Sequence, residues 1–150
     1  MVWQFFSEFS IIDAGKEVET MKMRRIDHVV LTVSNLEDAM RFYHEVFDMP
    51  VIDQQTTDDV ITLRCGHQLI RLQKADRDTD LKAPHPTIGA ADLCLVAGDK
   101  LDDILHHFRS YYVDVVTGPI EKRGSEGPMT SIYVHDPDKN LIEVSVYKNK

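Results

Sequence analysis

The order of predicted elements, β-α-β-β-β, occurs twice along this chain, and this repeat constrains the fold more than any other feature. The first copy opens with IDHVVLTV (Ile26–Val33), a β-rich run of strand length. Apolar residues then recur at helical spacing over Leu36–Phe47, behind a capping-box pattern of Ser34 and Glu37. Three short strands are expected to follow, at Val51–Gln54, Val60–Arg64 and Gln68–Gln73. Residues 25–73 are therefore expected to form one βαβββ module.

The second copy follows a polar, proline-containing connector, Lys74–Gly89. It begins with the strand candidate ADLCLVAG (Ala91–Gly98) and continues with apolar residues at helical spacing over Leu101–Tyr112. Its later strands are expected at Val113–Val116, Thr130–His135 and Leu141–Tyr147. The glycine-bearing segment Thr117–Pro128 is expected to be a loop, either a lid over a pocket or an ordinary surface loop. Residues 91–147 are expected to form the second module.

The two modules are expected to complete each other. A βαβββ unit alone leaves apolar sheet surface uncovered, so it needs a partner. We therefore expect an α+β fold in which residues 25–147 form a single domain, with an open, barrel-like eight-stranded sheet and helices on its outer face. Residues 1–24 are expected to be an N-terminal extension, or the product of a gene-start error upstream of Met21 or Met23.

Strand alternation predicts which side chains face away from the helices. In each strand one face is apolar and is expected to pack on the helices, whereas the other carries polar groups near mid-strand. These polar residues are His28, Arg71, Asp92, Tyr133 and Glu143. A solvated sheet face would also be polar. Here the polar groups are mixed with apolar neighbours, which is typical of a ligand pocket.

The amino-acid composition limits the classes of partner that the chain is expected to bind. The chain has 25 acidic and 17 basic residues and a formal charge of −8, which disfavours binding to nucleic acid or anionic membranes. No apolar run approaches the length of a membrane span. The isolated cysteines Cys65 and Cys94 are expected to be reduced and part of the core. These features predict a cytoplasmic protein with a small-molecule substrate.

Two long stretches carry a family resemblance. The opening IDHVVLTVSNLEDAMRFYHEVF and the closing SIYVHDPDKNLIEVSVY resemble the vicinal oxygen chelate superfamily, which includes glyoxalase I, extradiol dioxygenases, fosfomycin-resistance enzymes and bleomycin-binding proteins. HPTIGAADLCLV and GPIEKRG are similar to stretches of glyoxalase-domain proteins labelled as dioxygenase-related or virulence proteins. The resemblance implies a homodimeric lyase, isomerase or dioxygenase that uses a divalent metal ion and acts on a small, anionic substrate with vicinal oxygens.

The resemblance also implies a set of metal ligands. His28 matches the family's first-strand ligand and Glu143 matches its last-strand carboxylate, while Asp92 stands where the second module usually has a histidine. These three would hold Mn, Mg, Fe, Ni or Zn, and aspartate favours the harder ions. We expect His28 and Glu143 to point toward a common point. Arg71 stands where glyoxalase I has a glutamate, and a guanidinium cannot ligate a cation.

The remaining roles follow from this placement. Glu143 and Tyr133 are expected to be catalytic, the tyrosine as a proton donor, while substrate binding is expected from Arg71, Ser131 and Tyr147. Arg71 would hold a carboxylate or phosphate, or pair with Asp92 and Glu143. In that second case the chain would be a metal-free small-molecule binding or sequestration protein of the bleomycin-resistance type. A structural or interaction module is the third interpretation, if the polar face is merely solvated.

Overall fold

The computed structural model describes residues 20–149, and the N-terminal extension falls mostly outside this range. The first module contains β1 (His28–Val33), α1 (Leu36–Arg41) with a π-helical continuation (Phe42–Val46), β2 (Val60–Cys65) and β3 (Gln68–Lys74). The second contains β4 (Asp92–Val96), α2 (Leu101–Ser110), β5 (Val115–Gly124), β6 (Gly127–His135) and β7 (Leu141–Tyr147). The predicted α+β class and its open sheets are confirmed.

The two sheets have matching topologies. Their strand orders are β1-β3-β2 and β4-β7-β6-β5, and in each module the first strand pairs in parallel with the last. Val30 is the register partner of Arg71, and Cys94 is that of Glu143. The first residue of each opening strand, His28 or Asp92, stands two positions earlier. Arg71 and Glu143 therefore occupy equivalent positions in the two modules.

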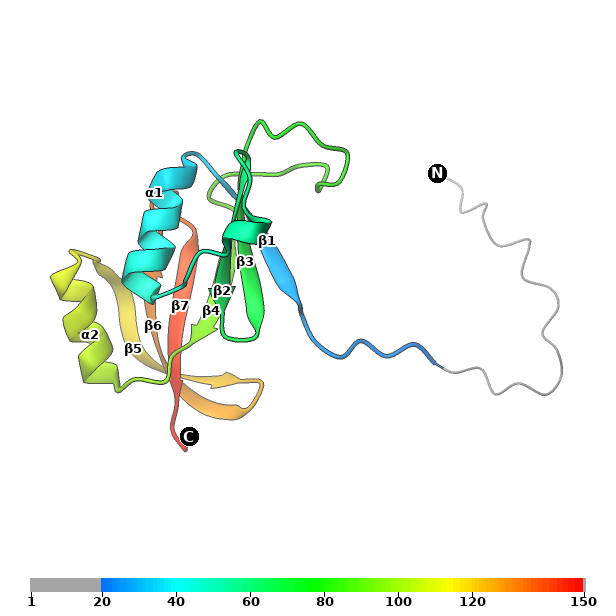
Figure 1. Ribbon diagram of the computed structural model, residues 1–150. Helices are drawn as coiled ribbons and strands as arrows, with labels where there is room; N and C mark the ends of the chain where they lie inside the picture. Colours follow the sequence, from blue (N-terminus) through cyan, green and yellow to red (C-terminus); the bar gives the residue numbers. More distant parts are fainter. Residues whose placement is uncertain (1–19, 150) are drawn as a thin grey trace, which may run out of the picture.

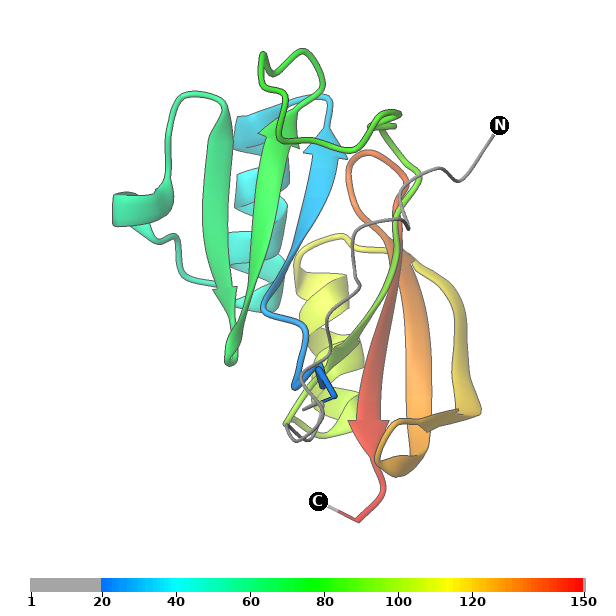
Figure 2. The same ribbon diagram turned by 90° about the vertical axis from the view of Figure 1, so that its right-hand side faces the viewer.

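Both helices cover the same side of the two sheets. Figure 1 shows α1 and α2 on one side of the strands, and Figure 2 shows the sheets side by side with the helices behind them. Leu31 and Val33 of β1 share one buried cluster with Ile142 and Val144 of β7. These side chains point toward the helices, as strand alternation predicts. His28, Arg71 and Glu143 consequently lie on the opposite face.

The turn between β6 and β7 ties the modules together. Tyr43 donates a hydrogen bond of 2.8 Å from its hydroxyl to Oδ2 of Asp136, and both residues are buried. Asp136 also accepts from the backbone and side-chain nitrogens of Asn140. Ser34 donates from its backbone nitrogen and its hydroxyl to the carboxylate of Asp138. This turn thus bonds the first module to the second, and a further contact of 2.8 Å joins Nε2 of His107 to the backbone carbonyl of Val46.

Three predictions of local secondary structure were wrong, and Cys94, which was expected in the core, is exposed. The first concerns the N-terminus of α1, where Oδ1 of Asn35 accepts from the backbone nitrogen of Asp38 at 3.0 Å, so Asn35 is the cap. Ser34 bonds across the module boundary instead and is no longer available for a capping box. An asparagine side chain is as good an N-cap as serine.

The second concerns the expected strand Val51–Gln54. Only Val51 pairs, in an isolated bridge with Leu63, and Asp53–Gln55 is a short 3₁₀-helix, so the described residues form seven strands rather than eight. The hydroxyl of Thr56 donates to the carbonyl of Ile52, which favours a turn over a ladder. The polar run that follows offers no alternating apolar face.

The third concerns the expected loop Thr117–Pro128. This segment belongs to a β-hairpin in which β5 pairs antiparallel with β6 up to Gly124 and Gly127. Nearly every residue of β5 is exposed, so the strand lacks the alternation by which it could have been recognised.

No helix within residues 20–149 combines the length and apolar content needed to span a bilayer.

Candidate functional site

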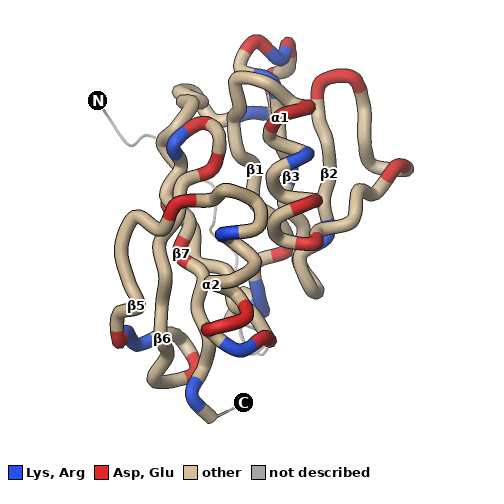
Figure 3. Tube along the Cα trace, turned by 90° about the vertical axis from the view of Figure 1, so that its left-hand side faces the viewer, with Lys and Arg blue, Asp and Glu red and all other residues tan. Residues whose placement is uncertain are grey.

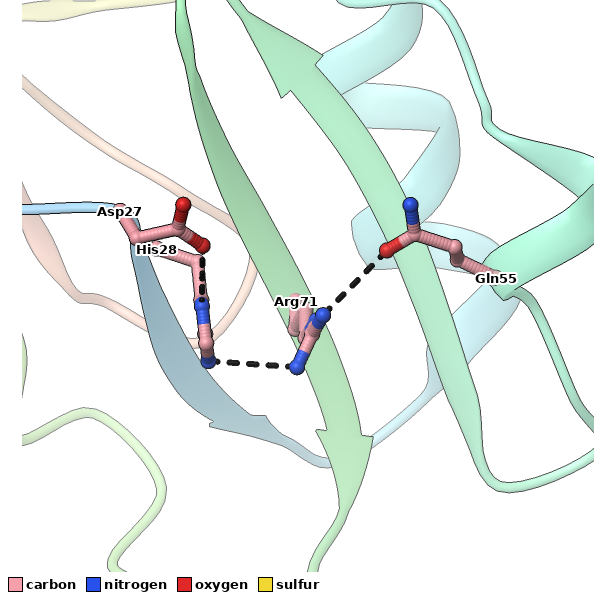
Figure 4. Close-up of polar contacts among 4 residues, drawn as sticks. All are labelled: Asp27, His28, Gln55 and Arg71. Carbon is pink, nitrogen blue, oxygen red and sulfur yellow. Dashed lines mark hydrogen bonds and ion pairs between the residues drawn. The ribbon is translucent and has the colours of Figure 1, made fainter.

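A chain of polar contacts crosses the helix-free face of the first module. Nδ1 of His28 lies 2.8 Å from Oδ1 of Asp27, and Nε2 of the same ring lies 3.2 Å from Nη1 of Arg71. The second terminal nitrogen of Arg71 donates to Oε1 of Gln55 at 3.2 Å. Figure 4 shows these four side chains in sequence, from the start of β1, across β3, to the 3₁₀ turn. The pattern of β1 and β3 therefore aligns an imidazole with a guanidinium.

The partners of His28 define its tautomer. A guanidinium can only donate hydrogen bonds, so Nε2 of His28 must accept and the ring proton must lie on Nδ1. Nδ1 then donates to Asp27, and this hydrogen bond is the largest of the effects that lower the pKa of the Asp27 carboxyl. The nitrogen lone pair with which His28 could bind a metal ion is thus directed at Arg71.

The second module places Glu143 between two groups that can carry protons. In the register of β7, Glu143 stands beside Cys94 of β4 and Tyr133 of β6. Removal from water and a hydrogen bond to Glu143 raise the pKa of the Tyr133 hydroxyl. Burial, followed by the charge of Glu143, raises the pKa of the Cys94 thiol against the opposing bond from Ser145. Both neighbours consequently stay protonated at neutral pH.

Glu143 also carries an unpartnered oxygen. Its Oε1 atom is buried and has no hydrogen-bond partner among the described residues. Buried polar atoms are almost always paired, because an unpaired one loses its water without compensation. A carboxylate oxygen in this state is suited to a proton donor or a cation from outside the chain.

The other predicted site residues are engaged differently. Ser131 is buried and its hydroxyl lies 2.7 Å from that of Ser145. Tyr147 is also buried, and its hydroxyl accepts from the backbone nitrogen of Glu126 at 3.1 Å. Asp92 is exposed at the start of β4. The roles of Ser131 and Tyr147 in substrate binding stay predictions.

The predicted ligands do not form a metal site within one chain. No three His, Cys, Asp or Glu side chains in residues 20–149 lie close enough together to hold an ion. His28 stands on the first sheet, whereas Asp92 and Glu143 stand on the second. Arg71 occupies the ligating nitrogen of His28 and would repel a cation there. This donor set, as arranged in one chain, does not fit a metal ion.

Sequence reasoning missed two members of the site. Asp27 orients His28, and its position directly before the histidine was the available signal. Gln55 supports Arg71 from a turn that was assigned to the end of a strand, so its direction could not be predicted. The position of Arg71, equivalent to Glu143, agrees with the sequence-based alignment of the modules.

The fold, with polar groups on the helix-free face of both sheets, places the chain in a known class. Residues 25–144 match the profile of the Glyoxalase/Bleomycin resistance protein/Dioxygenase superfamily, and the chain belongs to this family. It is 36% identical over 143 residues to Virulence protein STM3117 of Salmonella typhimurium, covering 95% of this chain and 98% of that protein. It is 34% identical over 134 residues to the Glyoxalase domain-containing protein RDO1 of Mycosarcoma maydis. This match covers 89% of this chain and 74% of that protein.

Solved structures show the same architecture. The crystal structure of the Salmonella protein gives a TM-score of 0.79 at 38% identity, covering 85% of this chain and 99% of that one. An integron cassette protein from the mobile metagenome of V. Cholerae gives 0.80 at 36% identity, covering 86% and 99%. A lactoylglutathione lyase from Agrobacterium tumefaciens gives 0.66 at 24% identity, covering 85% and 96%, and this likeness shows the fold alone.

Proposed function

We propose that this chain is a glyoxalase- or dioxygenase-like enzyme that binds a small anionic molecule with neighbouring oxygen atoms on its helix-free face. The observation that carries the proposal is the buried, unpartnered Oε1 of Glu143. A hydroxyl or an acidic C–H group of a bound molecule would supply the missing partner. Arg71, at the equivalent position of the other module, supplies the positive charge that an anionic molecule needs.

The two groups divide the chemistry between them. The planar guanidinium of Arg71 matches a carboxylate or phosphate, and its bonds to His28 and Gln55 fix its orientation. Glu143 is the acid-base group that accepts a proton from the bound molecule. Tyr133 stays protonated, and its hydroxyl, which hydrogen-bonds to Glu143 before the molecule binds, would turn to the oxygen on which negative charge develops. Proton transfer of this kind serves isomerase and lyase reactions.

A metal-dependent reaction is the second candidate. The unpartnered oxygen of Glu143 favours it, because a divalent ion would also satisfy that atom. The contact between Arg71 and His28 opposes it, since Arg71 would have to leave before Nε2 could bind an ion. Isothermal titration of Mn²⁺ into wild type and Glu143→Gln separates the candidates. The metal-free proposal expects no specific binding, and a stoichiometric site lost in the variant would establish the second candidate.

We propose further that the complete site forms in a homodimer. His28 and Arg71 stand on one sheet, and Asp92 and Glu143 on the other, so one chain offers two half-sites. Val96, which is 60% exposed, lies beside the second half-site and would be covered by a second copy. Mixing Arg71→Ala with Glu143→Ala chains would then restore one intact site per mixed dimer. Absence of restored binding, with dimers present, would contradict this arrangement.

The binding proposal is tested with oxalate, a dianion with neighbouring oxygens. Titration calorimetry compares wild type with Arg71→Gln and Glu143→Gln. Arg41→Gln and Glu37→Gln serve as controls, because these residues form an exposed ion pair on α1, away from the site. We expect Arg71→Gln to weaken oxalate binding at least about tenfold, since a charge-assisted hydrogen bond contributes about 1.5–3 kcal/mol. Equal affinities in Arg71→Gln and the controls would overturn the role of Arg71.

A further inference from the structure

A cavity of about 690 Å³ lies beside the connector that joins the two modules. Its lining includes Thr32 of β1, Gln73 of β3, and the connector residues Arg77, Leu81 and Lys82. Gln73 and Arg71 share a face of β3 and are two residues apart, which corresponds to about 7 Å along the strand. The cavity is therefore a continuation of the face that carries Arg71.

The charge of the cavity is opposite to that of the whole chain. The chain has a formal charge of −8, and acidic residues are scattered over the helix side of the molecule (Figure 3). Among the described residues that line the cavity there are two cations, Arg77 and Lys82, and no Asp or Glu. Asp76, Asp78 and Asp80 flank these cations along the connector but do not line the cavity, so the charge that lines it is positive and favours a small anionic ligand over a cation.

The polar floor of the cavity is fixed by its own hydrogen bonds. Gln73 is only 4% exposed. Its amide nitrogen donates to the hydroxyl of Thr32 at 3.0 Å, and its amide oxygen accepts from Nη1 of Arg77 at 3.4 Å. Lys82 donates to the backbone carbonyl of Arg77 at 2.6 Å. The two cations are thus held near each other by contacts within the cavity wall.

The remaining wall is apolar and open. Leu81 is 89% exposed and Val30 is 45% exposed, although both line the cavity. An apolar side chain left open at the edge of a concave site gains by contact with an apolar ligand. The cavity therefore combines a cationic end with an apolar surface.

We propose that this cavity binds a second anionic group of the substrate, a carboxylate or phosphate monoester attached to an apolar body. Arg77 and Lys82 hold the anion, and Leu81 and Val30 contact the apolar part. The inference rests on the proposed function, because Arg71 and Glu143 would hold the other end of the same molecule. The substrate would therefore be an elongated molecule with an anionic group at each end.

The test uses phenyl phosphate. Phenol, which lacks the negative charge, and inorganic phosphate, which lacks the apolar ring, serve as comparison ligands. Calorimetry compares wild type, an Arg77→Gln/Lys82→Gln variant, and the control Arg41→Gln/Lys100→Gln, which removes the same charge on the helix side. Wild type and control should bind phenyl phosphate about tenfold or more tightly than either counterpart, and the cavity variant should lose this advantage. The single variant Lys82→Glu, at an exposed connector position, should show the same loss if the double variant folds poorly.

The outcomes separate this inference from the proposed function. Loss of phenyl phosphate binding in the cavity variants, with retention in Arg71→Gln, supports the cavity site. Equal binding by the cavity variants and the control overturns it, as does the absence of phenyl phosphate binding by wild type. If the cavity variants bind both phenyl phosphate and oxalate like wild type while Arg71→Gln loses oxalate binding, the proposed function stands without the cavity site. If no variant affects either probe, both proposals fail.

Discussion

Nη1 of Arg71 lies 3.2 Å from Nε2 of His28, so a guanidinium stands where the family resemblance places a metal ion. The contact requires His28 to accept at Nε2 and to hold its proton at Nδ1, next to Asp27. One residue on β3 therefore changes the chemistry available to a residue on β1.

Replacing Arg71 by alanine should uncover the ligating nitrogen of His28. We expect Arg71→Ala to bind Mn²⁺ or Zn²⁺ more tightly than wild type, by about tenfold or more, because the competing cation is removed. Titration calorimetry measures the change. Adding His28→Ala to Arg71→Ala should cancel the gain, whereas an unchanged metal affinity in Arg71→Ala would show that the guanidinium does not compete with an ion.

Arg71→Ala should also leave the fold intact. The described contacts of Arg71 are with His28 and Gln55 rather than with Asp92 or Glu143, so its loss does not strand a buried carboxylate. We expect the free energy of unfolding to change by less than about 1 kcal/mol, as for a partly exposed polar contact. Urea denaturation measures it. A loss of several kcal/mol would indicate that Arg71 neutralises Asp92 and Glu143, as the sequestration alternative requires.

Glu143→Gln should separate binding from stability. The isosteric amide removes the charge next to the buried, unpartnered oxygen, so the variant should be as stable as wild type or more stable by about 1 kcal/mol. Oxalate carries no proton for Glu143 to accept, so its affinity should not fall in this variant, whereas turnover should be lost. A destabilised Glu143→Gln chain would mean that the carboxylate has a structural partner, and Glu143 would no longer be the acid-base group.

The repeat was sufficient to predict the α+β fold, because the helix-facing residues of β1, β3, β4, β6 and β7 alternate with a period of two, whereas β5 and the expected strand Val51–Gln54 show no such alternation. The same alternation placed His28, Arg71 and Glu143 on one face. It could not show what these residues contact, because hydrogen bonds depend on side-chain direction and on turns. Gln55 lies in such a turn, formed where a strand was predicted, and the contact of Arg71 with His28 was not predicted.

Stability should depend on pH through Tyr43. Burial, followed by the charge and hydrogen bond of Asp136, raises the pKa of this hydroxyl above its ordinary value of 10.0. Tyr43 therefore stays protonated in the folded state, while an unfolded tyrosine ionises as the pH passes 10, so its contribution is present below pH 10 and is lost above it. Urea unfolding from pH 8 to 11 should show a steeper loss for wild type than for Tyr43→Phe. Parallel curves would contradict the raised pKa.

The N-terminus of α1 offers a test of local structure. Asn35→Ala should reduce the free energy of unfolding by about 1 kcal/mol, since Oδ1 of Asn35 caps the helix. Glu37→Gln should change it by less than about 0.5 kcal/mol, because its exposed pair with Arg41 contributes little. Denaturant titrations compare the two variants. The reverse order would restore the capping box that the sequence predicts.

We propose that Arg71, and not a metal ion, provides the positive charge of the site. The most direct measurement combines metal analysis of protein purified without chelator with oxalate titration before and after EDTA treatment and removal of the chelator. We expect substoichiometric metal and an oxalate affinity that is unchanged by EDTA and reduced by Arg71→Gln. One divalent ion per chain, with oxalate binding lost on EDTA treatment and recovered when the ion is returned, would contradict it.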